Sequence, residues 1–196
     1  MIEELNWKKE GWIKVITGPM FAGKTKKLIN YYWELKKQGK EVVAFKPAID
    51  KRYSQNKIIS HDKEEIEAIP LGNIQEISAH LQKENQVILI DEIQLFFSEE
   101  VIKYLDNLAK QGKKIIVSGL DWNNFQNAPI SSVAGLLAAA NEVIKLTGIC
   151  DVCGNKATKT QWKLDYLPQK PSDYVGGAEK YTCRCRLHFI TDFAKK

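Results

Sequence analysis

Apolar residues follow two alternating patterns along most of the chain. Short apolar runs bounded by polar residues predict buried β-strands. Between the runs lie segments whose apolar residues recur three or four positions apart, which is typical of amphipathic helices. The predicted strands span 12–17, 41–45, 66–69, 87–90, 114–118 and 143–146. The predicted helices span 25–39, the segment around 74–81, the segment from a Ser98 cap to about Gly112, and 133–140.

This alternation predicts an α/β fold with a mostly parallel sheet, right-handed crossovers and helices on both faces. The unbroken apolar run 87–90 fits a central strand that is covered on both faces. In such sheets ligands gather at the carboxyl ends of the strands. The polar segment 46–62 has no sustained period and predicts a surface loop.

A glycine-rich loop joins the first predicted strand to the first predicted helix. Its residues are Gly18, Pro19, Met20, Phe21, Ala22, Gly23, Lys24 and Thr25. Backbone N–H groups in such a loop point at phosphate oxygens, and the following helix N-terminus adds partial positive charge. Lys24 is placed to reach the β- and γ-phosphates, and Thr25 to hold Mg²⁺. A simple turn before a helix is the alternative, and the flanking strand and helix disfavour it.

Asp91 and Glu92 close the apolar run 87–90 and therefore lie at the same sheet edge as the glycine-rich loop. The first carboxylate suits Mg²⁺, and the second suits a general base that accepts a proton from a hydroxyl nucleophile. The alternative for this pair is a helix cap. A phosphate cradle together with an acidic pair favours phosphoryl transfer.

All four cysteines lie between positions 150 and 185. Cys150 and Cys153 form one knuckle, and Cys185 and His188 repeat its spacing, which predicts a structural zinc site with four protein ligands. Cys183 is the alternative to Cys185 as a ligand. A redox pair of Cys150 and Cys153 competes with the metal site, but no helix opens directly behind it.

Chain length and net charge limit the number of domains and the kind of ligand. The chain has 196 residues and a net charge of +5, which suits one main domain with a satellite and an anionic ligand. We expect a P-loop α/β unit over 1–148 and a small zinc-binding unit over 149–196. Neither a long apolar stretch nor a signal-like start is present, so a cytoplasmic protein with no membrane partner is predicted.

Several motifs, in order and at matching spacing, resemble the type II thymidine kinases. The resemblance covers about residues 12–189. The motifs are the glycine-rich loop, Lys46 with Asp50 to Ser54 and His61-Asp62, Ile90 to Gln94, Gly119 to Phe125, Lys145 to Cys153, and Gly176 to His188. The resemblance implies a RecA-like P-loop NTPase core with a zinc-ribbon-like domain, and transfer of the γ-phosphate of ATP to thymidine, with thymidine monophosphate as product. Deoxyuridine is a second expected acceptor.

The resemblance also implies individual roles. Glu92 matches the general base, Lys24 and Thr25 the phosphate and Mg²⁺ residues, Asp91 the acidic metal partner, and Arg52 a cation near the phosphates. The thymidine pocket matches Met20, Gln94, Leu120, Phe125, Tyr174, Val175, Gly176 and Tyr181. Part of this pocket is the lasso loop, Ser172 to Tyr181. The family also implies a homotetramer and inhibition by thymidine triphosphate.

Two departures from the family pattern fall on the nucleoside side. Leu95 stands where many members carry an aromatic residue, and one extra residue separates Asp121 from Phe125. A nucleic-acid-dependent ATPase is the competing function, but the dispersed lysines do not form the basic, aromatic face that a nucleic-acid partner requires. A kinase with another deoxynucleoside acceptor is the second alternative.

Overall fold

The computed structural model describes residues 11–82, 86–163 and 168–190. Its centre is a six-stranded sheet in the order β10-β1-β7-β6-β2-β5, with every neighbouring pair parallel. The sheet strands are β1 (Trp12–Thr17), β2 (Val42–Pro47), β5 (Ile69–Leu71), β6 (Val87–Ile90), β7 (Lys114–Gly119) and β10 (Glu142–Lys145). The predicted parallel α/β fold is therefore confirmed.

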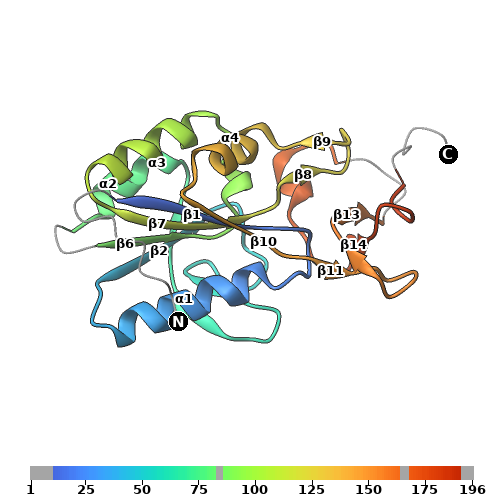
Figure 1. Cartoon of the computed structure of the whole chain (residues 1–196), viewed down its shortest axis with the longest axis horizontal. Helices are drawn as coiled ribbons and strands as arrows, with labels where there is room; N and C mark the ends of the chain where they lie inside the picture. Colours follow the sequence, from blue (N-terminus) through green and yellow to red (C-terminus); the bar gives the residue numbers. More distant parts are fainter. Residues whose placement is uncertain (1–10, 83–85, 164–167, 191–196) are drawn as a thin grey trace.

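Helices cover both faces of this sheet (Figure 1). Helix α1 (Lys24–Lys37) lies on one face, and α2 (Ile77–His80), α3 (Glu100–Lys110) and α4 (Ser131–Ala139) lie on the other. Successive side chains of a strand point to opposite faces of the sheet, so each strand contributes to the hydrophobic core on both sides. Ile88 and Ile90 pack in the core on the α3 side, whereas Val87 and Leu89 pack with α1. The fully apolar run 87–90 is thus buried on both faces, as expected of a central parallel strand.

The segment predicted as a surface loop, 46–62, contains regular structure. Strand β2 continues through Pro47, and β3 (Lys57–Ile59) pairs in an antiparallel hairpin with β4 (Glu65–Glu67). The hairpin forms because Ile58 and Ile66 face each other across it and pack into the core beside α1. The expectation of an irregular loop is wrong here, since two apolar residues were too few to reveal a strand pattern.

Other predicted boundaries need smaller changes. The predicted strand 66–69 divides into β4 and β5, and the helix around 74–81 consists of the 3-10 turn η1 (Ile74–Glu76) followed by α2. Ser98 Oγ accepts a hydrogen bond from the Glu100 amide, next to the start of α3. The 3-10 turn η2 (Ile93–Phe96) and the short hairpin of β8 (Trp122–Asn123) and β9 (Ala128–Pro129) were not predicted.

Small antiparallel pairs gather at one end of the molecule (Figure 1). Strand β11 (Gly148–Ile149) pairs with β12 (Lys156–Ala157), and β13 (Lys159–Trp162) pairs with β14 (Tyr181–Arg184). The 3-10 turn η3 (Pro171–Tyr174) leads into the rest of the lasso loop. The predicted division at 148/149 falls within β11, and the outer ends of both predicted units lie outside the described residues. Within the described ranges, no helix combines the length and apolar character needed to cross a bilayer.

Candidate active site and metal centre

The predicted phosphate-binding loop leaves β1 and curls into α1 through left-handed backbone. Gly18 has a φ of 136°, and Gly23, directly before α1, has a φ of 84°. A Cβ at Gly18 would lie 2.3 Å from the carbonyl oxygen of Leu146, so a larger residue does not fit. Phe21 also has a positive φ, 63°, and backbone strain of this kind clusters at ligand-binding sites. The loop is therefore shaped by local constraints at both of its ends.

Lys24 carries its amine back into this loop. Its side chain is buried, and Nζ donates a hydrogen bond to the Pro19 carbonyl at 2.8 Å. Burial lowers the pKa of Lys24, while the nearby carboxylates of Glu92 and Asp91 oppose that shift. A desolvated cation inside a ring of backbone groups suits an anionic ligand such as a phosphate.

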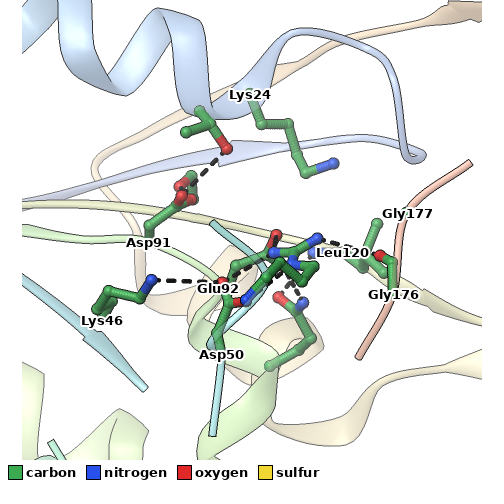
Figure 2. Close-up of polar contacts among 12 residues, drawn as sticks. Lys24, Lys46, Asp50, Asp91, Glu92, Leu120, Gly176 and Gly177 are labelled. Carbon is green, nitrogen blue, oxygen red and sulfur yellow. Dashed lines mark hydrogen bonds and ion pairs between the residues drawn. The ribbon is translucent and has the colours of Figure 1, made fainter. Parts of the chain in front are cut away.

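Asp91 lies at the carboxyl end of β6, directly across from the start of α1 (Figure 2). One carboxylate oxygen accepts a hydrogen bond from Thr25 Oγ1 at 3.0 Å, and the other accepts one from Ser118 Oγ. Burial, followed by repulsion from Glu92, raises the pKa of Asp91. A hydroxyl and a carboxylate in contact are oxygen ligands of the type that Mg²⁺ prefers.

Glu92 follows with a φ of 51° at the entry to η2. Its side chain is 14% exposed, and its two oxygens accept hydrogen bonds from Arg52 Nη2 and from Gln94 Nε2, the latter at 2.5 Å. Burial alone disfavours the charge, but Arg52 and Lys24 more than offset it and lower the pKa of Glu92. Glu92 is therefore a fixed, ionised carboxylate at the edge of the sheet.

Gln94 is buried and uses both ends of its amide. Besides donating to Glu92, it accepts a hydrogen bond from the Leu120 backbone amide through Oε1 at 3.0 Å (Figure 2). A Cβ at Gly119 would lie 2.5 Å from that Oε1 atom. Because residue 119 is a glycine, the Gln94 side chain has room to hydrogen-bond both Glu92 and the Leu120 amide.

Arg52 connects the carboxylates to the lasso loop. Nε and Nη2 donate to the two oxygens of Asp50 at 2.8 and 2.9 Å, and Nη1 donates to the Gly176 carbonyl at 3.3 Å. Asp50 is buried and was not among the predicted site residues; its signal was its place just after the carboxyl end of β2. Lys46, a motif residue with no predicted role, lies 4.0 Å from Asp50 and donates to the backbone carbonyls of Ser54 and Lys57.

A cavity of about 540 Å³ opens between these groups. It brings together Met20, Phe21, Gly23, Lys24, Thr25, Arg52, Asp91 and Glu92 from the predicted set. Gly177 of the predicted lasso loop also lines the cavity, as do several residues to which no role was assigned: Lys26, Lys46, Asp50, Tyr53, His61 and Asp62. The other residues predicted for thymidine, from Gln94 to Tyr181, lie outside the lining of this cavity.

An aromatic cluster lies between the β8–β9 hairpin and the lasso loop. Phe125 contacts Trp162 and Tyr174 edge to face, with ring centroids 5.3 and 5.4 Å apart, and Trp162 contacts Tyr181 at 5.0 Å. The Tyr181 hydroxyl donates to the Tyr174 carbonyl at 2.7 Å. The extra residue before Phe125 therefore does not separate its ring from the lasso loop. Trp162 was missed, because nothing in the sequence around it resembles a motif.

A hydrogen bond joins the glycine-rich loop to the small C-terminal sheets. The Met20 amide donates to Thr160 Oγ1 at 2.9 Å, and Thr160 lies on β13 with 3% of its surface exposed. Residues 140 positions apart are in direct contact here. Sequence analysis missed Thr160, since its neighbours give no sign of this partner.

Four predicted metal ligands meet beside β14. The sulfur atoms of Cys150, Cys153 and Cys185 and a ring nitrogen of His188 all lie within 4.8 Å of one another. Tetrahedral zinc with thiolate bonds of about 2.3 Å requires sulfur separations of about 3.8 Å. The Cys153 and Cys185 sulfurs are 3.9 Å apart, so this donor set fits zinc.

Cys183 is not a member of this ligand group, although it packs in the same small cluster as Cys150 and Cys185. Its side chain is buried, and a Cβ at Gly148 would lie 2.5 Å from its sulfur. Burial raises the pKa of Cys183, which disfavours the thiolate that a metal requires. The structure therefore groups Cys185, not Cys183, with the other candidate ligands.

The family model described as thymidine kinase matches residues 11–189. A curated thymidine kinase from Mycoplasma mycoides subsp. mycoides SC is 43% identical over 197 aligned residues, which cover 96% of this chain and 93% of that protein. The flagellar accessory protein FlaH from Methanocaldococcus jannaschii superposes with a TM-score of 0.49 at 15% identity, covering 76% of each chain. The family match and the identity over nearly the whole length of both chains show that this chain belongs to the thymidine kinase family.

Proposed function

We propose that this protein is a thymidine kinase that transfers the γ-phosphate of ATP to the 5′-hydroxyl of thymidine. One observation carries this proposal beyond family membership. A single cavity holds the amine of Lys24, the Thr25 and Asp91 pair, and the carboxylate of Glu92. A cradle for phosphates and a base for a hydroxyl must lie this close for direct transfer between two bound substrates.

In the proposed reaction Glu92 accepts the proton of the 5′-hydroxyl as its oxygen attacks the γ-phosphorus. The new bond joins that oxygen to phosphorus, the bond from phosphorus to the β,γ-bridging oxygen breaks, and ADP leaves. Lys24 and the loop amides from Gly18 to Thr25 neutralise the phosphates. Thr25 and Asp91 would hold Mg²⁺, which supplies positive charge to the phosphate oxygens when bound.

The ion pair between Arg52 and Glu92 sets a condition on this step. A carboxylate held by a guanidinium has a low pKa and is a weak base. Phosphate oxygens compete for the same guanidinium, and each hydrogen bond that Arg52 gives to phosphate weakens its hold on Glu92. Arg52 would then stabilise the transferred group while Glu92 becomes a stronger base.

We assign the nucleoside side to the predicted residues around the lasso loop. Phe125 and Tyr181 supply apolar ring surface, and Met20, Leu120, Tyr174, Val175 and Gly176 complete the wall of the pyrimidine pocket. Gln94 contributes through Glu92 and Leu120, which it already contacts. Zinc on Cys150, Cys153, Cys185 and His188 is structural, since four protein ligands leave no open position.

The remaining parts of the proposal rest on the family. They are a cytoplasmic homotetramer, inhibition by thymidine triphosphate, a RecA-like P-loop core over 1–148 and a separate zinc unit over 149–196.

Turnover with a panel of acceptors tests the proposal. Formation of ADP is measured with ATP and Mg²⁺ in the presence of thymidine, deoxyuridine, deoxycytidine, single-stranded DNA, or no acceptor. Phosphorylation of thymidine, with deoxyuridine next and deoxycytidine absent, is expected. ATP hydrolysis stimulated only by DNA would replace the kinase with the nucleic-acid-dependent ATPase, and deoxycytidine turnover would change the acceptor.

A further inference from the structure

The lasso loop has an unusual pattern of backbone hydrogen bonds. Every carbonyl from 173 to 178 accepts a hydrogen bond, although this stretch belongs to no β-sheet. The Lys180 amine donates to the carbonyls of residues 173 and 175, and the Tyr181 hydroxyl donates to the carbonyl of 174. The side chains of Arg52 and Lys163 donate to the carbonyls of 176 and 178. The backbone amides of 180 and 181 donate to the carbonyl of 177. Side chains therefore replace the ladder that a sheet would supply.

Lys180 makes the largest side-chain contribution. Its Nζ atom donates to the Asp173 carbonyl at 3.0 Å and to the Val175 carbonyl at 2.8 Å. An ammonium has three donors, so one side chain can hold two alternate carbonyls at once. Arg52 and Lys163 hold one carbonyl each and belong to other segments of the chain. Lys180 alone, among these cations, lies within the lasso loop.

Gly176 is shaped to admit the Lys180 side chain. A Cβ at Gly176 would lie 2.5 Å from Lys180 Cδ and 3.1 Å from its Cγ. Gly176 is buried, and its backbone is not in the left-handed region that favours glycine. The absence of a side chain at Gly176 therefore leaves room for the stem of Lys180 to reach the carbonyls beyond it.

All of these donors belong to the chain itself, so they can order the lasso loop without a contribution from a substrate. A loop that must be ordered by its ligand loses affinity to the entropy of ordering, and preorganisation removes that cost. We propose that Lys180 is a positioning residue that holds the lasso loop in its binding conformation and thereby sets the affinity for the pyrimidine nucleoside. The proposal rests on the proposed function, because the nucleoside is its ligand.

The test compares Lys180→Met with Lys163→Met. Both changes remove an ammonium and keep an unbranched stem, but Lys163 is exposed and, among the residues that the structure describes, its amine holds only the Ala178 carbonyl. For Lys180→Met we expect the KM for thymidine to rise about tenfold or more, the scale of one hydrogen bond from a charged donor. We expect kcat and the KM for ATP to stay within about twofold, since the lysine touches no reacting atom. Lys163→Met is expected to change the KM for thymidine far less.

Amide hydrogen exchange of the ligand-free proteins provides a second readout. Residues 173–178 should exchange at least about tenfold faster in Lys180→Met than in the parent protein, while the strands of the central sheet keep their protection. Lys180→Gln keeps one amide donor, so its exchange rate at residues 173–178 should lie between those of Lys180→Met and the parent protein. It also serves as the test variant if Lys180→Met loses zinc or fails to fold.

The outcomes separate the two proposals. An unchanged thymidine KM in Lys180→Met or Lys180→Gln overturns the role of Lys180, whether or not exchange increases. Equal exchange in variant and parent overturns it as well. A parent protein that does not phosphorylate thymidine contradicts the proposed function instead, and the exchange experiment then still decides whether Lys180 orders the lasso loop.

Discussion

The phosphate side and the nucleoside side of the candidate site are built in different ways. On the phosphate side, Lys24, Asp91 and Ser118 are buried at the ends of elements of the central sheet and its first helix. On the nucleoside side, the lasso loop has no strand partners over 173–178, and Tyr174 is 37% exposed. One side takes its geometry from a large hydrophobic core, and the other takes it from side-chain hydrogen bonds and a cluster of candidate metal ligands.

The difference explains where each side is vulnerable. Core strands open only with the whole domain, whereas short loops open locally at lower free energy. Changes near the zinc cluster should therefore remove nucleoside binding and leave the phosphate cradle in place. The following predictions test that separation.

Loss of a zinc ligand has the largest expected effect. In Cys153→Ser we expect zinc loss and thymidine turnover below detection, because β13, β14 and the lasso loop depend on the cluster. ATP binding should survive, since the glycine-rich loop folds with the central sheet. Metal analysis, turnover and calorimetric ATP binding check this outcome.

Cys183→Ala is the matched control, because Cys183 lies outside the cluster. It should keep zinc at the parent level. The separation of the two sides is refuted if Cys153→Ser loses ATP binding as completely as thymidine turnover.

Removing the proposed base is next in size. Glu92→Gln should lower kcat by about 10²- to 10⁴-fold, the usual contribution of a general base. The KM for thymidine should change little, because the amide keeps the size of the carboxylate. Steady-state kinetics measure both constants, with exposed Glu34→Gln as the control. A variant with near-parent kcat would exclude Glu92 as the base.

Adding a methyl group at Gly119, next to the Gln94 side chain that contacts Glu92, should have a smaller effect. In Gly119→Ala the new Cβ would lie 2.5 Å from Gln94 Oε1 and 2.7 Å from the Cγ2 atom of Ile93. We expect a loss of about 1–3 kcal/mol in unfolding free energy and a reduced kcat. Denaturation and kinetics measure the two effects.

Gly135→Ala provides the comparison, since its Cβ would lie 2.2 Å from Ile102 Cδ1, between α3 and α4. It should destabilise the protein to a similar degree without altering kcat of the folded enzyme. Equal changes of kcat in both variants would show that Gly119 acts only through stability.

Removing the hydrogen bond from the Met20 amide to Thr160, which joins the two sides, should have the smallest effect. Thr160→Val leaves the Met20 amide without its acceptor, and we expect a loss of about 1–3 kcal/mol in unfolding free energy. The KM values for both substrates should rise together, because the link touches both sides. Chemical denaturation and kinetics check this, beside Thr158→Val on the same edge. A rise in only one KM would assign Thr160 to that side alone.

The phosphate side was largely predictable from sequence. Lys24 and Asp91 each follow a strong apolar run, and the carboxyl ends of parallel strands meet at one edge. The central strands and α1 were found within a few residues for the same reason. The grouping of the candidate zinc ligands was also predictable, because their paired spacing is a local signal.

The nucleoside side was less predictable because its contacts join distant segments. Thr160 meets Met20, and Arg52 meets Gly176, through single hydrogen bonds that leave no periodic trace in the sequence. The β3–β4 hairpin was missed because each strand contributes one buried apolar residue. The sequence around Lys180 gives no sign of its two carbonyl partners, which the fold of the lasso loop brings to it.

The phosphate side and the nucleoside side are completed at different times during translation. Translation completes the central sheet first, and His188, the last ligand of the metal cluster, emerges only after nearly all described residues have been made. A polypeptide truncated between Cys153 and Cys185 would retain the nucleotide cradle but lack half of the metal ligands. The candidate metal site can therefore be completed only near the end of synthesis, after every strand of the central sheet has been made.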